Sequence, residues 1–234
     1  MRVQDQPAYI LHHRAFRDTS QILDVITPDY GRLTLMSRGS RSIKSRLKSI
    51  LQPFRPLLIG WTGKGEMPTL TQVEAQISKT FLLSGKSLPS AFYINELLIK
   101  LMHKHDVNEP IFRLYSSVLQ LLAEQHEVEP ILRLFEKKLL EALGFGLNLN
   151  IDTQTNEPIL AEIEYAYYLE HGPVKLTLVN DENFLLKLSG KSLLDLERNT
   201  LDSVQSLKDA KRLMRMVLNY YLEGKPIKSR ELFR

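Results

Sequence analysis

The spacing of apolar residues changes once along this chain, near residue 87, and that change constrains the fold more than any other feature. Before it, apolar and polar residues alternate with a period of two, as in strands whose side chains point to opposite faces of a sheet. After it, apolar residues recur every three or four positions, as on one face of a helix. The sequence therefore predicts a multidomain α+β chain with a β-rich N-terminal part and a largely helical remainder.

The N-terminal part contains five segments with strand-like patterns. They cover residues 9–13, 21–27, 32–36, 51–61 and 70–77. Turn chemistry at Pro28 and Gly31 joins the second and third segments into a hairpin. Short hairpin-linked strands suit a small β-barrel of the OB type, with an SH3-like barrel as the alternative that strand spacing leaves open. We expect residues 1–80 to form this OB-fold domain.

The remainder is predicted to be a helical domain interrupted by a small β lobe. Helices open at Ser87, Asn108 and Glu129, and short connections between them predict an antiparallel bundle. Helical spacing is lost over residues 147–185 and returns from residue 188. Between these limits, residues 162–169 and 174–179 flank a Gly-Pro turn and predict a β-hairpin. We expect the helical domain to comprise residues 81–150 and 186–234, with an inserted lobe at residues 151–185.

Positive charge is concentrated in two stretches of a chain whose net charge is only +4. Residues 32–65 hold eight cations and no acidic residue, and residues 207–234 hold eight cations and three acidic residues. Charge sorted in this way indicates a face that binds a polyanion, although a solvated surface is the simpler alternative for any one stretch. The candidate phosphate-binding residues are Arg32, Arg38, Arg41, Lys44, Arg46, Lys48, Arg55, Lys208, Lys211, Arg212 and Arg215.

Three aromatic residues near the first basic stretch have two interpretations. Tyr30, Phe54 and Trp61 would either stack on unpaired bases or pack in the barrel. Nucleic-acid binding is thus the class of function that the residues favour.

Enzymatic, metal-dependent and membrane functions find little support in the residues. The chain has no cysteine, its six histidines lack chelating spacing, and Gly60–Gly65 lacks the spacing of a phosphate-binding loop. We therefore expect no catalysis, no metal and no cofactor. No apolar run approaches the roughly 20 residues needed to span a bilayer, and residues 1–7 do not resemble a signal peptide, so we expect a cytosolic protein.

Short motifs spread over essentially the whole chain carry a family resemblance. They are Arg14-Ala15-Phe16, the SRGSR segment 37–41, Leu51-Gln52-Pro53-Phe54, the YINEL segment 93–97, Arg133 with Phe135-Glu136, Leu143-Gly144-Phe145-Gly146, and the GKPIKSRELF segment 224–233. Each is weak alone, but their order and spacing together resemble the RecO family of bacterial DNA repair and recombination mediators.

That resemblance implies both a fold and a set of partners. It implies an N-terminal OB-fold, binding of single- and double-stranded DNA, strand annealing without ATP hydrolysis, cooperation with RecR, and help in loading RecA within the nucleoid. It also implies contact with the C-terminal tail of single-stranded DNA-binding protein. Many members of the family hold a four-cysteine zinc site in the inserted lobe. Because residues 147–185 contain no cysteine and only His171, we expect a lobe held by packing without metal.

The tail peptide is acidic and ends in an aromatic residue, so its site needs an apolar pocket and a cation for the terminal carboxylate. Arg133, with Leu132 and Phe135 beside it, is the candidate, and its family motif supports the choice. The alternatives are that Arg133 pairs with Glu129 or Glu136, or that the peptide binds the cations of the last helix. For the chain as a whole, the runner-up function is an RNA- or ribosome-associated OB-fold protein.

Overall fold

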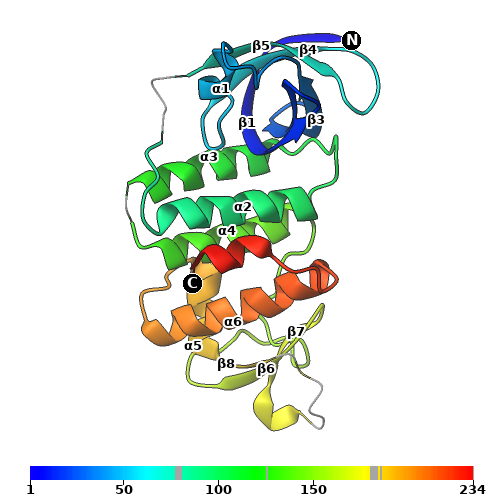
Figure 1. Ribbon diagram of the computed structural model, residues 1–234. Coiled ribbons are helices and arrows are strands. Elements are labelled where there is room, and N and C mark those ends of the chain that lie inside the picture. The colour runs from blue at the N-terminus through cyan, green and yellow to red at the C-terminus, as the bar shows by residue number, and fades with distance from the viewer. Residues whose placement is uncertain (77–80, 125, 180–183, 185, 234) are drawn as a thin grey trace. The chain divides into compact units, whose positions relative to one another are not determined.

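The computed structural model describes residues 1–76, 81–124, 126–179, 184 and 186–233. Its N-terminal strands close into a five-stranded barrel in the order β1-β2-β3-β5-β4 (Figure 1). Antiparallel pairing of β1 with β4 and parallel pairing of β3 with β5 complete the ring, and a short helix, α1, lies between β3 and β4. This topology is that of an OB-fold, which confirms the predicted domain type over the SH3-like alternative. The elements are β1 (Arg2–Phe16), β2 (Ser20–Thr27), β3 (Gly31–Ser37), α1 (Leu47–Ile50), β4 (Leu57–Thr62) and β5 (Thr69–Ala75).

Two strands differ from the sequence prediction. The first runs over 15 residues instead of residues 9–13, and it pairs with β2 along one part and with β4 along the other. Register shifts between Ile10 and His12 and between Val3 and Gln6 interrupt its alternation, so the pattern showed only one fragment of it. The fourth begins at Leu57 instead of residue 51, because Pro53 and Pro56 lack the N–H that a ladder needs.

The aromatic residues of the basic stretch belong to the interior of this unit. Trp61 is 2% exposed in the barrel core and meets Tyr30 edge to face, with ring centroids 5.0 Å apart. Phe54 is 8% exposed and packs edge to face on Phe92. Of the two roles considered from the sequence, stacking on bases or packing inside the protein, Trp61 and Phe54 therefore have the second.

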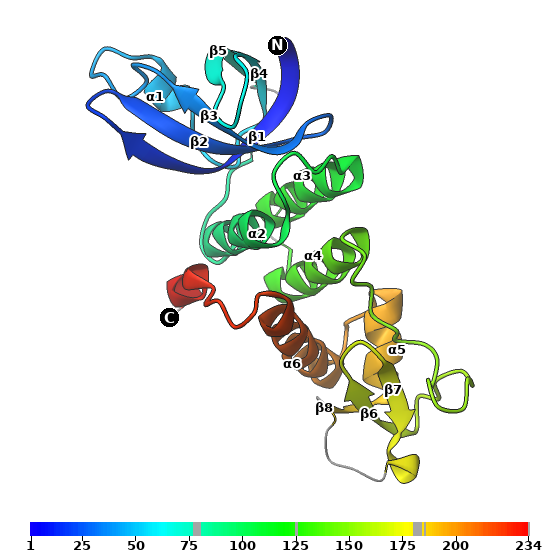
Figure 2. The ribbon, with the colours of Figure 1, turned by 90° about the vertical axis from the view of Figure 1, so that its right-hand side faces the viewer.

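Helices α2 (Ser87–Leu101) and α3 (Glu109–Ala123) lie side by side against the barrel (Figure 2). The buried Asn95 side chain of α2 donates to Leu11 O at 2.8 Å and accepts from the Tyr115 hydroxyl at 2.7 Å. The loop between the helices approaches Gly31 so closely that a Cβ there would lie 2.0 Å from Asp106 O, at a φ of +62°. Glycine is required at this position because only it tolerates both the conformation and the contact.

The C-terminal segment packs on α2. Its short helix η3 (Lys228–Phe233) is held by the Glu96 carboxylate, which accepts from Lys228 N at 2.9 Å and from Ser229 N at 2.7 Å. Phe233 meets Tyr93 edge to face, and the Arg230 guanidinium lies over the same ring. Residues 227–233 are thus an integral part of the unit that contains the barrel.

A second set of elements surrounds a three-stranded sheet of order β7-β6-β8. The predicted hairpin is found as β6 and β7, but its second strand begins at Gly172, so the Gly-Pro pair predicted as the turn is paired with β6. Residues 176–178 form a 3-10 turn instead of continuing that strand. A third strand, β8, occupies residues 186–189, where the sequence predicted a helix from residue 188. The elements are α4 (Val128–Ala142), β6 (Glu164–Tyr168), β7 (Gly172–Lys175), η2 (Leu176–Leu178), β8 (Leu186–Ser189), α5 (Gly190–Arg198) and α6 (Val204–Tyr221).

A buried carboxylate organises the loop before this sheet. Asp152 accepts from the N–H groups of Gln154 at 2.9 Å and Thr155 at 3.1 Å, and its second oxygen accepts from Lys175 N of β7 at 2.9 Å. Thr153 N also donates to Pro173 O. The carboxylate therefore ties the turn to the sheet with hydrogen bonds. Within the described ranges, no group of three or more His, Asp or Glu side chains is placed to hold a metal ion.

The chain separates into two compact units, Met1–His126 with Ile227–Arg234, and Glu127–Pro226. These two units are defined by the contacts between residues. The domains expected from the sequence, 1–80, 81–150 with 186–234, and 151–185, are defined by the kind of secondary structure, and they stay a prediction. No helix in the described part of the chain is long and apolar enough to cross a membrane.

Candidate nucleic-acid interface

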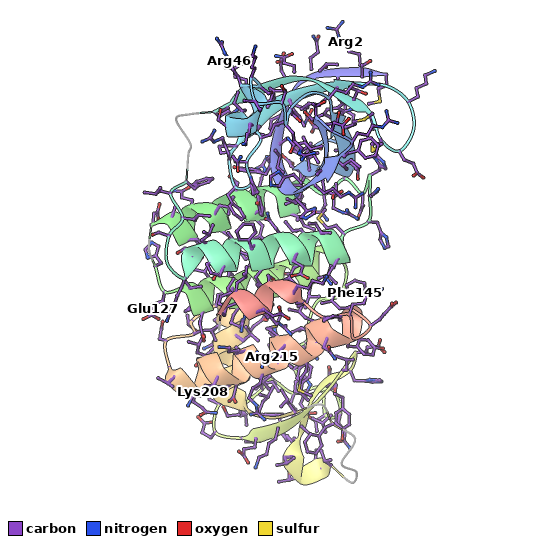
Figure 3. The ribbon with its side chains drawn as sticks, viewed as in Figure 1. Arg2, Arg46, Glu127, Phe145, Lys208 and Arg215 are labelled. Atoms are coloured by element: carbon purple, nitrogen blue, oxygen red, sulfur yellow. The ribbon has the colours of Figure 1, made fainter. Side chains whose placement is uncertain are left out.

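The loop that leads from β3 through α1 presents exposed cations on the barrel. Arg38, Lys44, Arg46 and Lys48 are all exposed, and none of the four forms an ion pair with any carboxylate in the described ranges. Arg46 projects outward from the barrel (Figure 3). Four unneutralised cations within eleven residues, on a surface with no acidic residue in the same stretch, are suited to contact successive phosphates.

Two arginines of the stretch shape this loop through backbone carbonyls. Arg41 Nη1 donates to Arg17 O at 3.1 Å and to Asp18 O at 3.4 Å, and Arg41 N donates to Thr19 O at 2.8 Å. Arg55 Nη1 donates to Ser49 O at 2.7 Å. Because these partners are neutral carbonyl groups, both side chains hold the loop and still contribute their positive charge to it.

Arg32 is engaged elsewhere. Its Nε donates to Met102 O at 3.1 Å, and its own carbonyl accepts from His105 N at 2.8 Å, so it joins β3 to the loop after α2. Burial lowers the pKa of Arg32, and the nearby Asp24 carboxylate opposes that shift. Arg32 therefore links the barrel to the loop that follows α2.

A groove of about 340 Å³ lies beside the basic loop. Two of its cations, Arg41 and Lys48, were predicted from the sequence to bind phosphate, whereas no sequence signal indicated the residues of β1 and β2 that line the groove with them. Strand alternation does not show that residues 13–15, 21 and 40–52 meet, since the pairing of β1 with β2 and the contacts of the loop after β3 with the β1–β2 turn bring them together. The lining residues are His13, Arg14, Ala15, Gln21, Ser40, Arg41, Lys48, Leu51 and Gln52.

Four cations of the second basic stretch, Lys208, Lys211, Arg212 and Arg215, lie on α6, in the other unit. The apolar face of this helix is buried through Leu213, Met214 and Val217, as the period predicted. Lys211 pairs with Glu129 at 2.6 Å, and Arg212 lies 3.5 Å from the buried Asp209.

The other two of the four cations on α6 make fewer contacts. Lys208 and Arg215 are exposed on α6 (Figure 3) and form no ion pair within the described chain. The four predicted cations of α6 therefore differ in how much charge they offer to a ligand.

The predicted peptide site on α4 is largely internal. Arg133 is 6% exposed and donates to Glu136 Oε1 at 2.6 Å, which is one of the pairings that the sequence left open. Leu132 and Phe135 are buried beside it. A carboxylate from a peptide would have to compete with Glu136 for this guanidinium.

A shallow apolar hollow of about 130 Å³ opens on another side of α4, where Ile131 and Leu134 meet Leu201. No sequence signal indicated it, because Leu201 precedes α6 and is distant in the chain.

Comparisons with known proteins agree along the whole chain. A family model described as "Recombination protein O N terminal" matches residues 1–78, and one described as "Recombination protein O C terminal" matches residues 84–231. A protein of Nitrosococcus oceani named "DNA repair protein RecO" is 44% identical over 232 residues, covering 99% of this chain and 93% of that protein. Proteins of the same name from Dechloromonas aromatica and Coxiella burnetii are 41% and 40% identical, covering 100% and 99% of this chain and 96% and 98% of their own lengths.

Proposed function

This chain belongs to the RecO family, a family of DNA repair and recombination, and from that premise we propose that it is a non-catalytic mediator that binds single- and double-stranded DNA. In this proposal it anneals complementary strands and helps to load RecA onto DNA covered by single-stranded DNA-binding protein, acting with RecR in the cytoplasm at the nucleoid. The cation-rich loop between β3 and β4 is the observation that carries the proposal.

The physical support is the state of the cations in that loop. Arg38, Lys44, Arg46 and Lys48 are exposed and unpaired with carboxylates in the described ranges, so no internal ion pair has to break before a phosphate binds. Binding of this kind releases condensed counterions, and the logarithm of the affinity then falls linearly with the logarithm of salt concentration. Contacts to phosphate are independent of sequence, which suits a protein that must act on any damaged site.

The test is a salt titration of fluorescently labelled single-stranded DNA with a loop variant. Lys44→Ala with Arg46→Ala removes two phosphate contacts without touching Arg41, which holds the loop. The slope of log affinity against log salt is expected to decrease in magnitude by about 1.4, or about 0.7 for each contact. The matched control, Lys104→Ala with Arg113→Ala, removes two exposed cations from the same unit outside the loop. An unchanged slope in the loop variant would contradict the assignment.

The runner-up, an RNA- or ribosome-associated protein, makes a different prediction in the same assay. A mediator is expected to accelerate annealing of complementary DNA strands, and equal affinity for RNA and DNA of the same length without annealing would favour the runner-up. RNA-binding sheets of barrel proteins commonly expose several aromatic residues for base stacking. Here Trp61 and Phe54 are buried, which favours the DNA mediator.

We also propose that the second unit binds the tail of single-stranded DNA-binding protein at α4. The hollow at Ile131, Leu134 and Leu201 supplies the apolar surface that an aromatic terminus needs. The predicted contacts Leu132, Arg133 and Phe135 belong to the same helix, where Arg133 is engaged by Glu136. Peptide binding would therefore use Arg133 by exchanging one carboxylate partner for another.

A further inference from the structure

The groove beside the basic loop differs in chemistry from the loop itself. Its lining combines three cations, Arg14, Arg41 and Lys48, with the imidazole of His13 and the side-chain amides of Gln21 and Gln52. No carboxylate belongs to the lining in the described chain. Cations alone would suit any polyanion, but an imidazole and two amides add groups that recognise planar, hydrogen-bonding rings.

Pairing of β1 with β2 fixes the positions of His13 and Gln21. His13 and Ala15 lie on the same face of β1 because they are two residues apart, and Ala15 is paired with Gln21 of β2. His13 Nδ1 lies 3.3 Å from Gln21 Oε1, so the ring and the amide hold each other in place. Leu51 is fully buried and closes the groove with an apolar side chain.

The Arg41 side chain and the backbone at Lys48 are also held by hydrogen bonds. Two backbone carbonyls of the β1–β2 turn accept from Arg41 Nη1, which leaves the rest of its planar fork to bind a phosphate. The Gln52 amide donates to Lys48 O at 2.7 Å and thereby fastens the end of α1. Groups held before binding lose little conformational entropy when a ligand arrives.

From this arrangement we infer that the groove binds one unpaired nucleotide of a DNA strand, with its phosphate at Arg41 and Lys48 and its base at His13 and Gln21. The inference rests on the proposed DNA binding and adds to it a site that selects single strands. A volume of about 340 Å³ lies at the lower end of the range of about 300–1,000 Å³ for ligand pockets, which suits one nucleotide. A paired base cannot enter, because its hydrogen-bonding edge is already occupied.

Base contacts and phosphate contacts respond differently to salt, and that difference provides the test. His13→Ala and Gln21→Ala remove no lysine or arginine, so each is expected to weaken binding of a single-stranded oligonucleotide about tenfold without changing the salt slope. Affinity for a duplex of the same sequence is expected to stay within twofold. His13→Phe preserves a stacking surface and is expected to retain most of the single-strand affinity.

Two further measurements separate this site from the phosphate-binding loop. An oligonucleotide whose sugars carry no bases should bind wild type about tenfold more weakly than the normal strand, and His13→Ala should abolish most of that difference. His103→Ala and Gln120→Ala, exposed residues of the same unit outside the groove, are matched controls expected to leave every value unchanged.

The outcomes distinguish the inference from the proposed function. Unchanged single-strand affinity in both His13→Ala and Gln21→Ala, with the wild type still binding DNA, would overturn the groove and leave the proposed function intact. An equal loss for single strands and duplexes would also overturn it, because the groove would then contact only backbone. A wild-type protein that binds no DNA would refute the proposed function itself. Thermal unfolding of each variant identifies any loss that comes from misfolding.

Discussion

Glu96 is predicted to be the anchor that keeps the C-terminal segment folded on α2. Its carboxylate accepts two backbone N–H groups, from Lys228 at 2.9 Å and from Ser229 at 2.7 Å, and it also pairs with Lys100 at 3.4 Å. Hydrogen bonds to a charged group contribute about 1.5–3 kcal/mol each when buried, and this carboxylate is only partly buried. We therefore expect Glu96→Ala to lower the free energy of opening residues 227–233 by about 2 kcal/mol.

Trypsin measures that opening directly. It cleaves after Lys228 and Arg230, which lie inside the anchored segment, whereas cleavage after Lys225 is blocked by the following Pro226. When cleavage is slow relative to closing, its rate follows the population of the open form, so about 2 kcal/mol corresponds to about 30-fold faster cleavage. Mass spectrometry of the truncated products gives the rate.

The control for this prediction is Glu109→Ala, which removes an exposed carboxylate paired with Arg113 on α3 of the same unit. It should leave cleavage within twofold of the wild type, because exposed pairs contribute little. Cleavage of Glu96→Ala at less than three times the wild-type rate would refute the anchoring role. The remaining contacts of Ile227 and Phe233 would then be enough to keep residues 227–233 folded on α2.

The same anchor is expected to weaken in acid. Partial burial alone would raise the pKa of Glu96, but hydrogen bonds from Ser229, Lys228 and Lys100 outweigh it and hold the pKa below the ordinary value of 4.5. A carboxyl with a depressed pKa in the folded state stabilises that state above its unfolded pKa, and the contribution is lost as pH falls through the folded value. Hydrogen exchange of residues 227–233 should therefore show loss of protection below about pH 4.5 that Glu96→Ala does not show.

Four other substitutions test how the chain holds its shape and where it binds the tail peptide. Asp152→Ala should lower the free energy of unfolding of the second unit by about 2 kcal/mol in urea, because three N–H groups lose that carboxylate. Elemental analysis of the wild-type protein should find no bound zinc, because residues 147–185 contain no cysteine and only one histidine. Gly31→Ala should lower the free energy of unfolding by about 2 kcal/mol or more, measured by thermal unfolding, since the Cβ of the new alanine would meet Asp106 O. Arg133→Ala should lower the free energy of unfolding by about 3 kcal/mol, because it leaves Glu136 without its arginine. Leu134→Ser should weaken binding of the tail peptide in a titration and should have a smaller effect on folding.

The sequence was sufficient for the elements whose signals are local. Alternation over 21–36 predicted the β2–β3 hairpin, and Asn108 with Pro110 predicted the start of α3, because a cap and a proline act within one turn. The acid-free basic stretch was visible for the same reason: charge is counted along the chain.

What the tertiary structure decided is which distant residues meet. β1 is one 15-residue strand because both β2 and β4 pair with it, and no local pattern survives the register shifts that this double pairing requires. Pairing of β1 with β2 and the fold of the loop after β3 likewise brought His13 and Gln21 to Arg41 and Lys48 in one groove, and packing of the end of α2 on β3 joined Arg32 to Met102. Such contacts form between side chains of different elements. The period of apolar residues and the charge along the sequence carry no information about which of these side chains lie close together in space.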